Sequence, residues 1–296
     1  MPAPKSPLSA MRLLWFKTWV VAARPRGEQL AIMSSATAPV RIGLAGALGR
    51  MGRAIAGALE GRAGARLVLA FDRPGTEGKP LGALKLGTAA DVAGCDVAID
   101  FSTAEASTLL AEIAAERGAP ALVIGSTGWT DPEDARLRAA ATRVAIVRSG
   151  NFSLGVNVLA GLVEAAARRL AAADWDIEVF EAHHRRKIDA PSGTALMLGE
   201  AAARGRGAAL ADVEVRARDG IAGPRQEGAI GFSVMRGGGI VGEHAVVFAA
   251  EEEVLTLKHS ARDRGLFARG AVAAALWVAG KPPGLYDMMD VLGFRS

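Results

Sequence analysis

Residues 181–195, EAHHRRKIDAPSGTA, gather side chains that could exchange protons with a bound molecule. His183 and His184 are two of only four histidines in the chain, and Lys187 follows them closely. Histidine and lysine are common proton donors and acceptors in enzymes. The Pro-Ser-Gly-Thr turn that ends the stretch opens a predicted helix, and free N–H groups at a helix start bind anions. The stretch therefore predicts a site that protonates a small, doubly anionic substrate.

The two histidines are expected to play different roles. They lie at the end of a predicted strand at 176–182, and adjacent strand residues point to opposite faces. The following loop is rich in cations and includes Lys187. The next helix, predicted at 192–205, presents backbone N–H groups near Gly193 and the hydroxyl of Thr194 to a carboxylate.

This stretch has three other interpretations. A zinc site at the two histidines is disfavoured, because no further Cys or His stands at ligand spacing and the neighbouring arginines and lysine repel a cation. A nucleophilic Ser192 lacks the GxSxG context of such serines. A purely structural loop stays open on these residues alone. We predict no metal.

A glycine-rich turn lies upstream, in GLAGALGRMG at residues 43–52. It joins a predicted strand at 40–46 to a predicted helix at 50–62, which is the context in which helix N–H groups hold a pyrophosphate. The spacing is GxxGxxG rather than GxGxxG, since Leu48 stands where the second glycine would be. A tight strand–helix packing turn is the alternative.

The end of the second predicted strand strengthens the nucleotide interpretation. Asp72 follows Gly52 by twenty residues, and an acid there can accept from the ribose 2′-OH of NAD, whereas Arg73 can pair with the 2′-phosphate of NADP. The chain is therefore predicted to use NADPH, NADH or both. Polar turns at 125–128 and 149–152 follow two further strands and point to the same edge of the sheet.

The pattern of elements predicts a Rossmann-like α/β fold followed by an α+β domain. Apolar runs at 40–46, 66–71, 96–101, 120–125 and 143–148 alternate with helical stretches at 50–62, 104–117 and 132–141, which is typical of a doubly wound parallel sheet. After Gly150 come a helix at 155–173, the strand at 176–182 and the helix at 192–205. Strands at 212–218, 229–236, 240–249 and 253–259, with a glycine turn at 237–239, predict a mixed or antiparallel sheet. A helix at 264–280 closes the chain.

Charge and composition limit the classes of partner. The net charge is +4, but five basic residues and one acidic residue fall within the first 33 positions, so the rest of the chain is neutral. A neutral body does not predict nucleic-acid binding. No apolar run reaches the ~18–20 residues that span a bilayer, and a single cysteine, Cys95, fits a reducing compartment.

Residues 1–36 form an extension ahead of the predicted fold. We expect either a disordered segment or a misassigned start, with Met33 as an alternative first residue. The sequence RLLWFKTWVVAA at 12–23 leaves open an amphipathic surface or targeting helix and a secretory signal, although the apolar run is short and interrupted by Lys17.

From Arg41 to Gly293 the chain closely resembles the 4-hydroxy-tetrahydrodipicolinate (dihydrodipicolinate) reductases of lysine and diaminopimelate biosynthesis. The motifs are GALGRMG, GSTGWT, SGNFSLGVNV, EAHHRRKIDAPSGTAL, GAIGFSVMRGGGIVGEHAVVF and GLYDMMDVL. The resemblance implies NAD(P)H-dependent reduction of a small cyclic dicarboxylate at ring carbon 4. It also implies a cytoplasmic homotetramer, a dinucleotide-binding domain at 37–153 plus 265–296, and a substrate-binding and oligomerisation domain at 154–264.

The resemblance also implies roles for individual residues. His183 matches a general acid/base and Lys187 a proton donor, while His184, Gly193 and Thr194 match contacts to the substrate carboxylate. Asp72 and Arg73 match contacts to the adenosine ribose. The remaining cofactor contacts implied are Gly46, Ala47, Leu48, Gly49, Arg50 and Met51 at the pyrophosphate, and Gly125, Ser126, Thr127, Ser149, Gly150, Asn151 and Phe152 at the nicotinamide. Ser126, Ser149 and Gly150 depart mildly from the family pattern.

Overall fold

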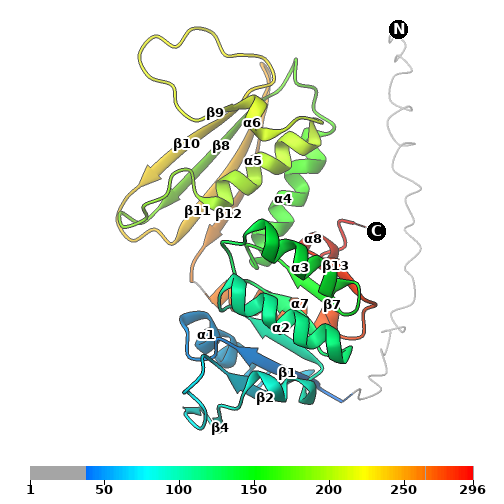
Figure 1. Cartoon of the computed structure of the whole chain (residues 1–296). Coiled ribbons are helices and arrows are strands. Elements are labelled where there is room, and N and C mark those ends of the chain that lie inside the picture. Colours follow the sequence, from blue (N-terminus) through cyan, green and yellow to red (C-terminus); the bar gives the residue numbers. More distant parts are fainter. Residues whose placement is uncertain (1–37, 264, 296) are drawn as a thin grey trace, which may run out of the picture. The chain divides into compact units, whose positions relative to one another are not determined.

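The computed structural model describes residues 38–263 and 265–295. The predicted extension at 1–36 lies outside this part of the chain. The described residues build one six-stranded sheet, one five-stranded sheet and a two-stranded hairpin (Figure 1). None of the described helices is long and apolar enough to cross a membrane.

The six-stranded sheet is parallel throughout, in the order β13-β7-β6-β5-β1-β2. Its central strand β5 is buried at every position, as expected for a strand covered on both faces. The doubly wound, Rossmann-like prediction is confirmed. The strands are β1 (Val40–Ala45), β2 (Ala65–Phe71), β5 (Val97–Asp100), β6 (Ala121–Ile124), β7 (Ala145–Arg148) and β13 (Gly284–Tyr286).

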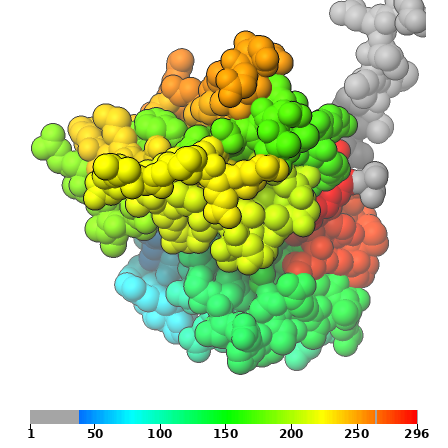
Figure 2. All heavy atoms as spheres, turned by 90° about the horizontal axis from the view of Figure 1, so that it is seen from above, coloured from blue at the N-terminus to red at the C-terminus, as the bar shows by residue number. Residues whose placement is uncertain are grey.

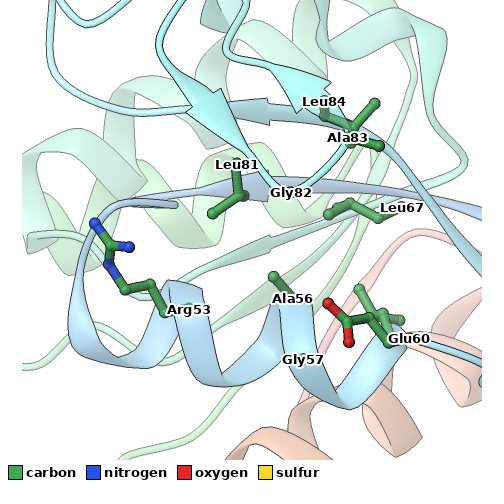
Figure 3. Close-up of a pocket in the computed structure, with 10 residues that line it drawn as sticks. Arg53, Ala56, Gly57, Glu60, Leu67, Leu81, Gly82, Ala83 and Leu84 are labelled. Carbon is green, nitrogen blue, oxygen red and sulfur yellow. The ribbon is translucent and has the colours of Figure 1, made fainter.

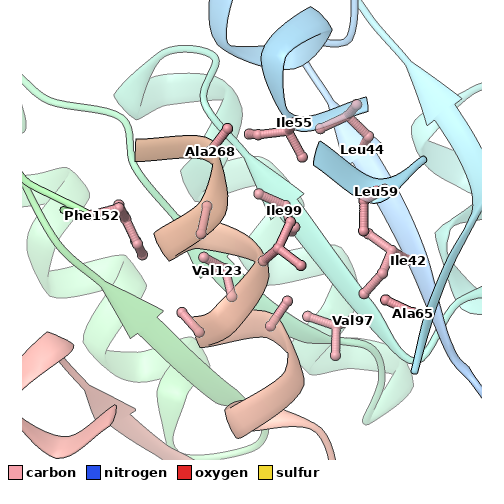
Figure 4. Packing of buried hydrophobic residues seen from close by; sticks show 14 of the residues in the cluster. Ile42, Leu44, Ile55, Leu59, Ala65, Val97, Ile99, Val123, Phe152 and Ala268 are labelled. Atoms are coloured by element: carbon pink, nitrogen blue, oxygen red, sulfur yellow. The ribbon is translucent and has the colours of Figure 1, made fainter. Parts of the chain in front are cut away.

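Helices cover both faces of this sheet. One apolar cluster packs α1 (Arg50–Leu59) and α7 (Gly265–Val278) on one face (Figure 4), and another packs α2 (Ala104–Arg117) and α3 (Asp131–Ala141) on the other. Local signals set the helix ends. Thr103 caps α2 by accepting from the Ala106 N–H, and Thr130 and Glu133 form a capping box at α3.

The C-terminal segment returns to the first sheet. Helix α7 joins its core, and β13 extends its edge by pairing in parallel with β7. A short helix, α8 (Met288–Val291), follows. The strand β13 was not predicted, because three half-buried residues leave too short a pattern to recognise. The hairpin β3 (Pro80–Leu81) and β4 (Leu84–Lys85) and the 3-10 helix η1 (Ala89–Gly94) were missed for the same reason.

The five-stranded sheet is mixed, in the order β12-β11-β8-β10-β9. Strand β8 is parallel to β10 and antiparallel to β11. Helices α4 (Leu154–Ala167) and α5 (Gly193–Gly205) pack on one face of this sheet around Leu198, Val179 and Phe248. The predicted α+β unit with a mixed sheet is confirmed. The strands are β8 (Asp176–His183), β9 (Glu214–Val215), β10 (Ile230–Arg236), β11 (Gly242–Ala249) and β12 (Val254–Ala261).

The chain departs from the sequence pattern at two places in this region. The glycine turn at 237–239 joins strands that are not neighbours, because β10 and β11 flank β8 on opposite sides. It passes the end of β8, where the Gly237 N–H donates to the His183 carbonyl. The strand predicted at 212–218 is the helix α6 (Leu210–Val213) followed by the two-residue β9. The chain from 216 to 229 then runs irregularly and mostly exposed over the surface (Figure 2), in keeping with its charged, glycine-rich sequence.

Gly270 on α7 gives a direct test of this packing. A Cβ there would lie 1.6 Å from the Phe152 carbonyl oxygen, which is backbone and cannot swing away. We expect Gly270→Ala to cost at least ~1–3 kcal/mol of unfolding free energy, as overpacking does, measured by urea denaturation. Gly57→Ala on α1 is the control, because a Cβ there meets nothing within 4 Å. An equal stability of the two variants would contradict the packing described.

Candidate active site

A cavity of about 720 Å³ opens at the carboxyl ends of β1, β2 and β5. Ligands of open α/β sheets bind at this edge. Five of the predicted cofactor residues line the cavity, together with the apolar side chains of α2. These five are Gly46, Leu48, Gly49, Asp72 and Arg73.

The glycine turn is shaped so that its backbone approaches this cavity. Gly46 has a φ of 65°, which favours glycine. A Cβ at Gly52 would lie 2.3 Å from the Gly46 oxygen, so only glycine allows the turn to close against α1. Asp72 holds the turn by accepting from the Leu48 N–H at 2.8 Å. Ala47 is fully buried in the core and does not line the cavity. The cradle and cavity fit a dinucleotide.

A buried polar chain connects the ends of β5 and β6. Asp100 accepts from the Ser107 hydroxyl at 2.7 Å, and Ser107 lies 2.8 Å from the hydroxyl of Ser126. Burial raises the pKa of Asp100, against the opposing effect of hydrogen bonds from Ser102 and Ser107. Asp100 lines the cavity and was not predicted, although it ends a strand at the ligand-binding edge.

Two aromatic rings link the cavity to the next group of predicted residues. The Phe101 ring lies against Gly125, where a Cβ would come within 2.2 Å of it, and its centroid is 5.3 Å from that of Phe152. Phe101 lines the cavity, whereas Gly125 to Thr127 and Ser149 to Phe152 do not. Arg50 and Met51, in the first turn of α1, also lie outside its lining.

Asn151 joins the cofactor-side residues to the substrate-side residues. Its side-chain amide donates to the Thr194 hydroxyl at 3.0 Å. The loop is fixed from behind, because the Ser149 hydroxyl and the Asn157 amide both donate to the Asn151 carbonyl. Residues 43 positions apart in the chain are therefore in direct contact, as the predicted site requires.

The inner face of the five-stranded sheet changes from apolar to polar along β8. Ile177 and Val179 join the core, while Glu181 and His183, on the same face, are buried polar side chains. They lie beside the start of α5, where Ser192 caps the helix by accepting from the Ala195 N–H. The polar end of the face is thus where the covering helix begins.

Glu181 is the centre of this polar group. Its fully buried carboxylate accepts from the guanidinium of Arg236 through two nitrogens, at 2.8 and 2.9 Å, and from the Ser192 N–H at 3.0 Å. The carboxylate oxygen that does not bind Ser192, Oε2, lies 2.5 Å from His183 Nδ1. Burial raises the pKa of Glu181, but the hydrogen bonds from Arg236, His183 and Ser192 outweigh it, so the pKa is lowered and the carboxylate is ionised.

His244 completes the group from β11. Its ring meets the His183 ring edge to face, with centroids 5.0 Å apart, and its Nε2 lies 3.2 Å from the Ser192 hydroxyl. Burial, and then the neighbouring His183, lower the pKa of His244 to about 4. At neutral pH His244 is therefore uncharged.

A tight turn brings Lys187 back beside the end of β8. The Lys187 N–H donates to the His184 carbonyl at 3.0 Å, and the Lys187 ammonium lies 2.8 Å from the Asp189 carboxylate. The hydrogen bond from Lys187 lowers the pKa of Asp189. Arg236 also donates to the Asp189 carbonyl. His184, half-buried, lies one residue beyond the end of β8. Strand alternation therefore does not reach it, and the prediction that the two histidines have different roles stays a prediction.

Glu181, His183 and His244 place one possible metal-ligand atom each within 4.8 Å of one another. Arg236 already neutralises the Glu181 carboxylate, and this carboxylate already contacts His183 Nδ1. This donor set favours a hydrogen-bonded network over a cation, and the prediction that no metal is used stays a prediction.

A second hollow lies between α1 and the β3–β4 hairpin (Figure 3). Apolar side chains such as Leu67, Leu81 and Leu84 line it, with Arg53 and Glu60 at its margin. None of the predicted site residues belongs to its lining, and we assign it no role.

Reasoning from sequence missed Glu181, Arg236 and His244. Glu181 could have been found, because it stands two residues before His183 and so shares its face. Arg236 and His244 could not, because their positions depend on the order of strands in the sheet, which local sequence patterns do not determine.

A nucleotide-sized cavity on a doubly wound sheet, with a buried histidine–carboxylate pair on the second sheet, defines a two-part nucleotide-dependent oxidoreductase. Family models of dihydrodipicolinate reductase match both parts, the N-terminus at residues 40–152 and the C-terminus at residues 155–292.

Individual relatives agree. The chain is 66% identical to 4-hydroxy-tetrahydrodipicolinate reductase of Caulobacter vibrioides over 87% of this chain and 99% of the relative. It is 50% identical to that of Rhizobium rhizogenes, over 87% and 98%. A dipicolinate-bound dihydrodipicolinate reductase from Paenisporosarcina sp. TG-14 has the same fold, with a TM-score of 0.70 at 22% identity over 86% and 99%. The chain therefore belongs to the dihydrodipicolinate reductase family, the pyridine-nucleotide-dependent reductases of lysine and diaminopimelate biosynthesis.

The lowered pKa of His244 predicts a pH dependence of stability. The unfolded histidine titrates near 6.5 and the folded one near 4, so between these values the unfolded state binds more protons. Stability must fall as the pH drops through this window, with a share from His244 on the order of 3 kcal/mol. Urea denaturation of wild type and His244→Gln at several pH values measures the difference. A variant with the wild-type slope would contradict the assignment.

Proposed function

We propose that this chain reduces 4-hydroxy-tetrahydrodipicolinate to tetrahydrodipicolinate, with NADPH or NADH as the reductant. The observation that carries the proposal is the 66% identity to the Caulobacter vibrioides reductase over nearly the whole length of that relative. The particular nucleotide is open, because Asp72 suits the ribose of NADH and Arg73 the 2′-phosphate of NADPH.

The substrate in this proposal is a small cyclic dicarboxylate. Dipicolinate, which is bound in the Paenisporosarcina relative, belongs to this chemical class. In this chain Gly193 and Thr194 stand in the first turn of α5, a 13-residue helix, where backbone N–H groups and the helix dipole favour a carboxylate. His184 and the ammonium of Lys187 add polar and cationic contacts.

The cofactor in this proposal occupies the cavity at the glycine turn. Residues Gly46 to Met51 hold its pyrophosphate, and Asp72 and Arg73 its adenosine ribose. Residues Gly125 to Thr127 and Ser149 to Phe152 lie at the nicotinamide. The buried contacts among Ser126, Ser107 and Asp100, and the partly buried contact between Asn151 and Thr194, support these assignments because they hold the two loops in fixed positions.

The chemistry assigned to the chain is proton handling. When bound, the reduced nicotinamide supplies a hydride to carbon 4 of the substrate ring after water has left. Negative charge then develops on the acceptor, and a positioned acid must neutralise it. We assign Lys187 as the proton donor and His183 as the general acid/base, with the cationic loop stabilising the developing charge.

We further propose that the enzyme is a cytoplasmic homotetramer assembled through the five-stranded sheet. The outer face of this sheet, opposite α4 and α5, exposes the apolar side chains of Phe180 and Met235. Exposed apolar surface of this kind is typical of subunit interfaces.

The direct test supplies the condensation product of aspartate semialdehyde and pyruvate to the purified protein. We expect the protein to oxidise NADPH, NADH or both, which is measured as a loss of the absorbance of the reduced nicotinamide. No oxidation should occur when either condensation partner is omitted. No oxidation of either nucleotide would overturn the proposed function.

Lys187 should be essential for turnover. We expect Lys187→Ala to lower kcat by ~10²–10⁴, because general acid catalysis contributes about that much, with little change in NADPH affinity measured by fluorescence titration. Lys85→Ala, on the distant and exposed β4, is the matched control. Near-normal turnover of Lys187→Ala would remove Lys187 from the mechanism.

A further inference from the structure

The ionised carboxylate of Glu181 is a buried group that the proposed mechanism does not yet use. It is fully buried, two residues before His183 on the same face of β8, and lies 2.5 Å from Nδ1 of that histidine. A carboxylate at one ring nitrogen of a catalytic histidine fixes the tautomer and the ring orientation, and stabilises the charged imidazolium.

We propose that Glu181 is a positioning residue for the reduction: it accepts the Nδ1 proton of His183 in a hydrogen bond, directs Nε2 to the substrate and supports the protonated ring. The inference rests on the proposed role of His183 and extends it. Glu181 itself stays ionised throughout and exchanges no proton with the substrate.

The surroundings of Glu181 are built to hold it in one position. Arg236 binds both carboxylate oxygens from β10, and the Ser192 N–H at the start of α5 binds one of them. Bidentate arginine contacts fix a carboxylate in orientation as well as in charge. Because two separate elements hold the carboxylate, it can in turn fix the ring of His183.

Gly242 lies beside the other ring nitrogen of His183, Nε2. A Cβ at Gly242 would lie 3.2 Å from His183 Nε2, which is tighter than an ordinary contact. Glycine at this position therefore leaves room beside the nitrogen that would exchange a proton. Nδ1 is already occupied by Glu181, so Nε2 is the atom left for the substrate.

The charges around His183 make Glu181 its main anionic partner. From β10 comes the cation Arg236, from β11 His244, which is neutral near pH 7 because burial lowers its pKa, and from the following turn the cation Lys187, paired with Asp189. Removing the charge of Glu181 leaves the imidazolium among cations. The proton-bearing form of His183 should then be harder to reach.

The test replaces Glu181 with glutamine, which keeps the shape and removes the charge. We expect Glu181→Gln to lower kcat ~10–100-fold, and to move the limb of the kcat/KM pH profile that reports His183 by about one unit or more to lower pH. NADPH affinity should be unchanged. Glu178→Gln is the matched control: it stands on the same strand, on the opposite face, and pairs with Arg218 and Arg225. It should leave kcat and the profile as in wild type.

A second variant tests whether a loss of activity comes only from an unpaired buried charge that disturbs folding. Glu181→Gln leaves Arg236 without its partner, and breaking a buried ion pair from one side is costly. The double variant Glu181→Gln with Arg236→Gln leaves no lone charge and should show the same loss of kcat. Its pH profile should shift in the same direction by a smaller amount, because a cation that disfavours the imidazolium has also been removed. A wild-type pH profile and kcat in either folded variant would overturn the inference.

The outcomes separate this inference from the function on which it rests. If wild type oxidises no nucleotide, the proposed function fails. If wild type is active and His183→Gln is also fully active, the role of His183 fails, and that of Glu181 with it. If only His183→Gln is impaired and the Glu181 variants are not, Glu181 is structural and the inference alone fails.

Discussion

The buried carboxylate of Glu181 is the interaction on which the second half of this molecule depends. A charge with no exposure to water must be neutralised and hydrogen-bonded where it lies. Arg236 from β10, the Ser192 N–H at the start of α5 and His183 at the end of β8 meet this requirement together. One charge therefore fixes a strand pairing, a helix start and a histidine ring. The loop that carries Lys187 is tied to the same point, since Arg236 also binds the Asp189 carbonyl.

The first half of the molecule is organised by backbone geometry instead of charge. Gly52 lets α1 close against the turn, and Asp72 holds that turn through the Leu48 N–H. Gly270 lets α7 pack against the backbone of Phe152, whose ring contacts Phe101 at the cavity. The adjacent residue, Asn151, binds Thr194 at the start of α5. Two neighbouring residues, Asn151 and Phe152, therefore connect the core of the first sheet to the site on the second sheet.

Sequence patterns predicted the parallel sheet well, because strands buried on both faces are continuous apolar runs and the helices between them carry caps such as Thr103. Strand order in the second sheet did not follow from sequence. The glycine turn at 237–239 joins two strands that are not neighbours, passes the end of β8 and places Arg236 beside Glu181. Partners such as Arg236 and His244, which depend on that order, lie beyond the reach of local pattern.

If Glu181 positions His183 as proposed, the ring carries its proton on Nδ1 and leaves Nε2 free for the substrate. The chain has only four histidines, so ¹⁵N NMR of histidine-labelled protein can resolve each ring, with His183→Gln assigning the signal of interest. We expect neutral His183 to carry its proton on Nδ1, with that proton far downfield as in a hydrogen bond to a carboxylate, and Nε2 to be unprotonated. A neutral ring protonated on Nε2, or a mixture of the two tautomers, would contradict this expectation.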